Sequence, residues 1–116
     1  MIDLHPDHLE AAYEFLCRFE PFIQWKLPSA HEVAFTVNAT KSKRGEYELR
    51  LDGTHHILIS INCTGLIDSL IKVMAHEMTH LYQFQRKTNS KHYHNAEFKE
   101  LAKEICDIHG WDYRLF

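Results

Sequence analysis

Apolar residues with helical spacing mark the second half of the chain. Spacings of four, three, four and three residues separate Ile67, Ile71, Met74, Met78 and Leu81. Because an α-helix has 3.6 residues per turn, these positions fall on one side of a helix, which is then its buried side. The pattern predicts a helix that begins just after Gly65 and ends at about Arg86.

Two further segments show the same period, one near each end of the chain. The first runs from Pro6 to Phe22, and Pro21 and Pro28 are signals for its end. The second runs from Asn95 to about His109 and is followed by Gly110, a residue type that favours the left-handed conformation at helix ends. Both segments are predicted to be amphipathic helices that cover a sheet.

Three runs between these helices have the composition and alternation of strands. They are Glu32–Asn38, Gly45–Leu51 and His55–Asn62. Asp52-Gly53 is a hairpin-type turn between the last two runs. The sequence therefore predicts an α+β fold in which a small antiparallel sheet, a meander, packs against about three helices.

Length and composition fit one globular unit. The chain has 116 residues, of which 45% are hydrophobic, so we expect residues 1–116 to form a single domain. The cysteines are odd in number and lack a C-x-x-C pair: Cys17, Cys63 and Cys106. We therefore expect a reducing compartment, without a disulfide framework or a zinc ribbon.

The charge balance limits the partners of the chain. The net charge is −3 with neutral histidines, which gives no general attraction to nucleic acid. Any contact with DNA is expected to be local, through Lys41, Lys43, Arg44, Arg86, Lys87 and Lys91. No apolar run approaches about 18 residues and no signal pattern opens the chain, so we expect a cytoplasmic protein without a membrane partner.

The central predicted helix carries His76, Glu77 and His80 beside its apolar stripe, within Leu70–Gln83. Residues four apart lie on the same face, so the two imidazoles can bind one metal ion. In H-E-x-x-H hydrolases zinc lowers the pKa of a water molecule and the glutamate acts on that water as a base. The pattern predicts one zinc ion per chain and hydrolytic chemistry.

A catalytic zinc site needs a third protein ligand. The metzincin arrangement would place a glycine and a histidine shortly after the motif, where this chain has Gln83 and Arg86, so that arrangement is excluded. The remaining downstream candidates are His92, His94, Glu97 and Glu100. A glutamate would give a gluzincin-like site. Cys63 precedes the helix without the motif that surrounds a cysteine ligand, and we discount it.

HEMTHLYQ followed by HNAEFKELAKEI resembles the SprT-like zinc metalloprotease domain, which bacterial SprT proteins share with the DNA–protein-crosslink protease Spartan. In that family, the histidine of a His-Gly-x-x-Phe element is the third zinc ligand. His94-Asn95-Ala96-Glu97-Phe98 matches this element, with Asn95 where the family often has glycine. Asparagine tolerates the conformations that glycine supplies, so the departure is mild. The resemblance covers about Val33–Gly110.

The resemblance implies a zincin-like fold and a zinc metalloprotease that hydrolyses peptide bonds of protein substrates, including DNA-associated proteins. It implies that His76, His80 and His94 bind zinc and that Glu77 activates water. In zincins generally, a strand above the active helix pairs with an extended peptide, and we expect His55–Asn62 to be that strand.

Two alternatives to this function stay open. The first is a non-catalytic module, stabilised by zinc, that binds a protein or DNA. The second is a gluzincin-like peptidase with Glu97 or Glu100 as the third ligand. For a catalytic site, Tyr82 and Tyr93 are candidates to donate a hydrogen bond to the oxyanion.

Overall fold

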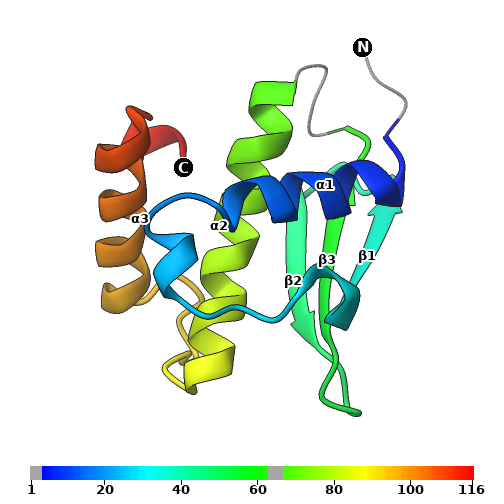
Figure 1. The fold of residues 1–116 in the computed structure, drawn as a ribbon, viewed down its shortest axis with the longest axis horizontal. Helices are drawn as coiled ribbons and strands as arrows, with labels where there is room; N and C mark the ends of the chain where they lie inside the picture. Colours follow the sequence, from blue (N-terminus) through cyan, green and yellow to red (C-terminus); the bar gives the residue numbers. More distant parts are fainter. Residues whose placement is uncertain (1–3, 63–66) are drawn as a thin grey trace.

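Three helices and a small sheet follow one another along the chain in the computed structural model (Figure 1). The structure describes residues 4–62 and 67–116. Within them the elements are α1 (Pro6–Leu16), β1 (Val33–Asn38), β2 (Gly45–Leu49), β3 (His55–Ser60), α2 (Ile67–Arg86) and α3 (Ala96–His109), with 3-10 helices at Phe22–Gln24, Ala30–Glu32 and Tyr113–Leu115. The predicted α+β class is confirmed.

The sheet is mixed, so the predicted antiparallel meander is wrong. β3 lies between the other two strands, parallel to β1 and antiparallel to β2. β2 and β3 form the predicted hairpin, and Gly53 in its turn has a φ of 88°. The alternation of side chains within a strand does not specify which strands pair. The sequence pattern therefore did not predict that β1 pairs with β3. As a result, β3 has no free edge, whereas β2 is an edge strand.

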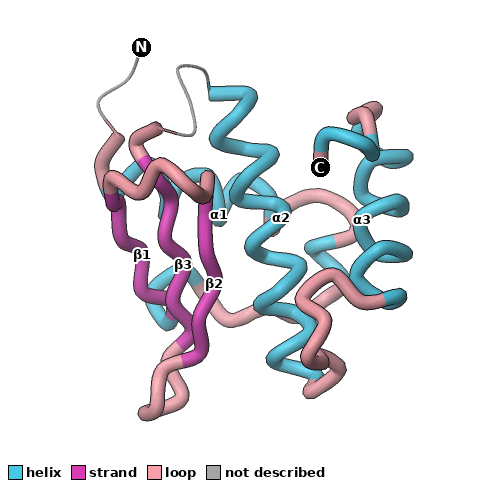
Figure 2. The backbone as a smooth tube through the Cα atoms, turned by 180° about the vertical axis from the view of Figure 1, so that it is seen from behind, coloured by secondary structure: helices cyan, strands magenta, loops and turns pink. Residues whose placement is uncertain are grey.

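Helix α2 lies at the centre of the molecule. Figure 2 shows it between the sheet and α3, and α1 packs against both α2 and β1. The apolar side of α2 is buried at Met74, Met78 and Leu81, each 0% exposed. These residues join Ile57 and Ile59 of β3 in the hydrophobic core. Because this side faces the core, other sides of α2 remain for polar residues.

Helix α3 begins and ends where the sequence predicts. Asn95 is its N-cap, and the Asn95 Oδ1 accepts a hydrogen bond from the Phe98 N–H at 2.9 Å. Gly110 has a φ of 73°, the left-handed conformation that commonly ends a helix. Cys106 is 2% exposed, as expected for a packing residue.

Helix α1 is shorter than its apolar pattern predicts. It ends at Leu16, and the later apolar residues form the 3-10 helix Phe22–Gln24 instead. Pro21 lacks an N–H group, and its ring would clash with the Cys17 carbonyl in a continuous helix, so one helix cannot extend to Phe22. Trp25 then stacks on Tyr82 of α2, with ring centroids 4.2 Å apart. No helix in the described part of the chain has both the length and the apolar character needed to cross a membrane.

Candidate metal centre

Helix α2 presents two imidazoles from successive turns. His76 and His80 are four residues apart, and their ring centroids lie 5.1 Å from each other. His80 is 3% exposed, and the ring of Phe98 stacks on it at 4.5 Å. Burial lowers the pKa of His76 to about 4 and the pKa of His80 to about 3. Both rings are therefore neutral at pH 7, which is the form that binds a metal ion.

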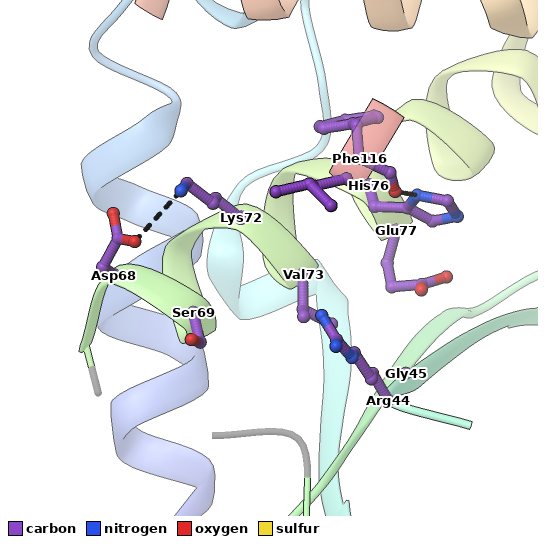
Figure 3. A pocket seen from close by; sticks show the side chains of 10 residues that line it. Arg44, Gly45, Asp68, Ser69, Lys72, Val73, His76, Glu77 and Phe116 are labelled. Carbon is purple, nitrogen blue, oxygen red and sulfur yellow. Dashed lines mark hydrogen bonds and ion pairs between the residues drawn. The ribbon is translucent and has the colours of Figure 1, made fainter. Parts of the chain in front are cut away.

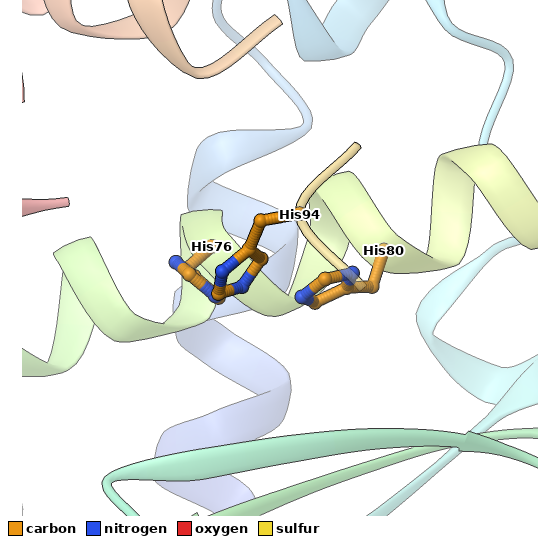
Figure 4. A group of neighbouring side chains, drawn as sticks. All are labelled: His76, His80 and His94. Carbon is orange, nitrogen blue, oxygen red and sulfur yellow. The ribbon is translucent and has the colours of Figure 1, made fainter. Parts of the chain in front are cut away.

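A third imidazole comes from outside the helix. His94 lies between α2 and α3, immediately before the N-cap residue Asn95. Figure 4 shows the ring of His94 together with those of His76 and His80. One ring nitrogen from each of the three residues lies within 4.8 Å of the others. The structure thus brings together the three histidines that were predicted to bind zinc.

One pair of nitrogens in the cluster already has the spacing of a zinc site. Zinc–nitrogen bonds of 2.0–2.1 Å in a tetrahedral arrangement place the nitrogens about 3.3 Å apart, and the Nε2 atoms of His76 and His94 are separated by 3.2 Å. The His76 Nδ1 donates a hydrogen bond to the backbone oxygen of Phe116 at 2.9 Å. Since a carbonyl only accepts, Nδ1 carries the proton and Nε2 offers its lone pair to the cluster. These residues can hold a zinc ion.

Polar side chains fix the segment that carries His94. Gln83 of α2 is 1% exposed, and its Nε2 donates hydrogen bonds to the Asn95 Oδ1 and the Glu97 Oε1, both at 2.9 Å. The Thr88 hydroxyl also donates to Glu97. Among the described residues, the metal-binding group includes neither Glu97 nor the exposed Glu100. The arrangement therefore favours His94 over a glutamate as the third ligand.

Glu77 lies beside the histidines and borders two adjoining cavities, one of them drawn in Figure 3. The residue is 5% exposed, and burial together with the charge of Glu46 raises its pKa to about 8. No hydrogen bond within residues 4–62 and 67–116 occupies its carboxylate, so this group is available to a ligand in either cavity. Gly45 of β2 approaches it closely, because a β-carbon on Gly45 would lie 3.0 Å from the Glu77 Oε2.

The two predicted oxyanion donors lie in different places. Tyr93 borders the cavity that Glu77 and the three histidines share, and its hydroxyl donates to the backbone oxygen of Tyr47 at 3.1 Å. Tyr82 is stacked on Trp25 and does not border that cavity. Of the two, Tyr93 is the one near the site.

His92 and the two histidines of β3, His55 and His56, lie outside the metal-binding cluster. His92 is exposed and outside the metal-binding group found in the described part of the chain. The His55 ring forms a hydrogen bond with the Tyr47 hydroxyl, and the His56 Nδ1 lies 2.7 Å from the carboxylate of Glu48. Cys63, which the sequence led us to discount, lies outside the described residues.

Two contributors to the site were not identified from the sequence. The Phe116 carbonyl is a backbone group 40 residues away from His76, and no pattern of residue types marks it. Gly45 did carry a usable signal, because a glycine within a strand often marks the close approach of another segment.

The fold and the site define an α+β protein with a cluster of three histidines that can bind a metal ion. Residues 12–113 match the SprT-like family, so the chain belongs to this family. Its members are generally zinc-binding, metallopeptidase-like domains. No curated protein and no solved structure matches the chain. The match confirms the resemblance and extends it to both sides of Val33–Gly110.

Proposed function

We propose that this chain is a zinc-dependent metallopeptidase of zincin type that hydrolyses peptide bonds in protein substrates. The observation that carries the proposal is that Glu77 borders the same cavity as His76, His80 and His94. This cavity, the central cavity, encloses about 270 Å³ and is bordered by β2, an edge strand. A base and a metal-binding group therefore face one space that is open to a peptide.

Each group has a defined part in the proposed reaction. The three histidines would hold a zinc ion, which supplies a Lewis acid for the scissile carbonyl and lowers the pKa of water. Glu77 accepts a proton from the attacking water as the carbon–oxygen bond forms. It then donates this proton to the amide nitrogen as the carbon–nitrogen bond breaks. A divalent cation beside Glu77 favours its carboxylate form, which suits a base in so buried a position.

Strand β2 is the segment best placed to align a substrate. The expected strand, His55–Asn62, contains β3, which is central and paired on both sides. β2 has a free edge, and the Tyr47 carbonyl on it accepts the hydrogen bond from Tyr93 across the central cavity. We infer that an extended peptide adds to this edge through main-chain hydrogen bonds. Tyr93 then turns its hydroxyl from Tyr47 to the developing oxyanion.

Substituting Glu77→Gln tests the reaction. The variant retains the size of the side chain but lacks the base, so we expect one zinc per chain and a loss of about 100-fold or more in the rate of peptide cleavage. Zinc is measured by elemental analysis, and cleavage by mass spectrometry of a denatured protein substrate. A variant that cleaves at the wild-type rate would show that Glu77 is not the base.

Zinc content also separates the competing interpretations. His94→Ala is expected to lose tightly bound zinc, whereas Glu100→Ala, a control in the same part of the chain, retains it. Unchanged zinc affinity in His94→Ala would favour the gluzincin-like site instead. A wild-type protein that holds zinc but cleaves no substrate would favour the non-catalytic binding module.

Contact with DNA stays a prediction. Lys43 and Arg44 border the cavities at Glu77, which places two of the basic residues next to the site. Arg86 lies at the other end of α2, where it pairs with Glu97 at 3.9 Å and contacts the ring of Tyr82. Comparing cleavage with and without single-stranded DNA, at several salt concentrations, tests this partner.

A further inference from the structure

A second cavity adjoins the central cavity on the side of the N-terminal half of α2 (Figure 3). This side cavity encloses about 320 Å³, and Gly45, His76 and Glu77 border both cavities. A peptide whose scissile bond lies at Glu77 therefore extends past the mouth of the side cavity. The side chain of a residue next to that bond can enter it.

One wall of the side cavity is apolar. It is formed by Val73 of α2, which is 8% exposed, and by Leu115 and Phe116 from the segment after α3. The Phe116 carbonyl is held at 2.9 Å by the His76 Nδ1, and the two rings lie 5.3 Å apart. Phe116 is thus held beside the histidine cluster, and the apolar wall suits the methylene groups of a side chain.

Charged side chains of both signs form the remaining border, and the Glu77 carboxyl group is one of them. Arg44 immediately precedes β2, and its side chain extends toward Val73 (Figure 3). Lys72 also borders the cavity, but its Nζ pairs with the Asp68 carboxylate at 3.0 Å, so these two charges offset each other. In the described ranges, none of the ion pairs involves Arg44. Arg44 is therefore the basic residue on this border whose charge is left for a ligand, while the Glu77 carboxyl group lies where the two cavities meet.

We propose that the side cavity binds an acidic side chain, aspartate or glutamate, of a substrate residue adjacent to the scissile bond. Arg44 pairs with its carboxylate, since a guanidinium can bind both carboxylate oxygens at once. A lysine or arginine at the same substrate position would meet a like charge, which excludes it. This inference rests on the proposed peptidase function and assigns a substrate preference to it.

A peptide library tests the preference. The zinc-loaded wild-type protein is expected to cleave sequences with aspartate or glutamate at one position next to the bond about threefold to tenfold better than the glutamine equivalents. Arg44→Glu should reverse this preference toward lysine and arginine. Lys41→Glu makes the same charge change in the same loop without bordering either cavity, and should leave the preference unchanged. Equal cleavage of acidic and neutral sequences, or equal effects of the two variants, would overturn the proposal.

A binding experiment decides the question without turnover. Capped alanine-rich hexapeptides containing one central Glu or Gln are titrated into the Glu77→Gln protein, with and without zinc, and followed by NMR. We expect the Glu peptide to bind about threefold to tenfold more tightly and to shift the amide signals of Ser69 and Val73. Adding Arg44→Glu should remove the difference, while adding Lys41→Glu should retain it.

The two experiments keep the failure of this inference distinct from failure of the proposed function. If the zinc-loaded wild-type protein cleaves no library peptide, the peptidase function fails, and the NMR titration still tests the cavity. Equal affinity for the Glu and Gln peptides would overturn the acidic preference whether or not the protein is a peptidase.

Discussion

The lack of a side chain on Gly45 leaves room for the Glu77 carboxylate. A β-carbon on Gly45 would lie 2.9 Å from the Val73 Cγ1 and 3.0 Å from the Glu77 Oε2. Optimal contacts between carbon atoms are about 3.5–4.0 Å, so neighbouring groups would have to move. Both residues are buried, but the Val73 side chain is short and branched, whereas the Glu77 carboxylate is at the end of a longer side chain that can turn. The carboxylate is therefore the group that we expect to be displaced.

We predict that Gly45→Ala lowers kcat about 10- to 100-fold and leaves the zinc content at one per chain, because a small misplacement of a catalytic group has a large effect on rate. Ser42→Ala, in the exposed part of the same loop, is the control and should behave as wild type. Steady-state kinetics on a cleaved peptide and elemental analysis provide the measurements. A wild-type kcat in Gly45→Ala would mean that the close contact does not position Glu77.

At the scale of elements, the junction between α2 and α3 completes the site. Gln83 joins α2 to both Asn95 and Glu97, so one buried amide connects the helix that carries two of the histidines to the segment that carries the third. Polar groups that orient metal ligands contribute strongly to metal affinity, even when they do not touch the ion.

We predict that Gln83→Met weakens zinc binding about 10- to 100-fold while the helical content is retained. Methionine has a similar length but donates no hydrogen bond, so the segment around His94 loses its anchor. Gln85→Met, two residues further along the same helix and exposed, is the control. Zinc affinity is measured by competition with a chromophoric chelator, and helical content by circular dichroism. Equal affinities of the two variants would contradict a positioning role for Gln83.

The sequence predicted the helices of this site better than its sheet. The apolar stripe on α2, the apolar period of α3 and the glycine at its end are local signals, so α2 and α3 were located from these alone. The order of strands depends on contacts between distant segments, and the parallel pairing of β1 with β3 has no local signature. For the same reason, the motif identified His76 and His80 directly, whereas His94 needed the family resemblance.

At the scale of the whole molecule, burial of the site makes the stability of the metal-free protein depend on pH in two opposing ways. Burial lowers the pKa of His80 from 6.5 to about 3, so the unfolded chain binds more protons between these values and stability falls as pH drops. Burial raises the pKa of Glu77 from 4.5 to about 8, so the folded protein binds more protons between these values. Its contribution to stability is therefore lost as pH rises.

We predict that Glu77→Gln stabilises the metal-free protein at pH 8.5 by about 2–4 kcal/mol more than it does at pH 4.5. As pH rises, the buried Glu77 carboxyl group must either ionise without water or retain its proton, and both lower the stability of the folded protein. Glutamine does not titrate and has neither effect. Urea unfolding of the metal-free wild type and variant at both pH values measures the difference. The other titrating groups are common to both proteins and cancel to a first approximation. An equal difference in stability at the two pH values would contradict burial of the Glu77 carboxylate.

The three histidines are held in unequal ways. His76 and His80 belong to one 20-residue helix packed in the core, whereas His94 is exposed and precedes the N-cap of α3. For a zinc ion bound by all three, the bond to His94 is the one that opens by movement of a short segment, without unfolding of α2. The rate of metal exchange with the surroundings is then governed by that segment. The lifetime of the zinc-loaded protein would then depend on the connection between α2 and α3.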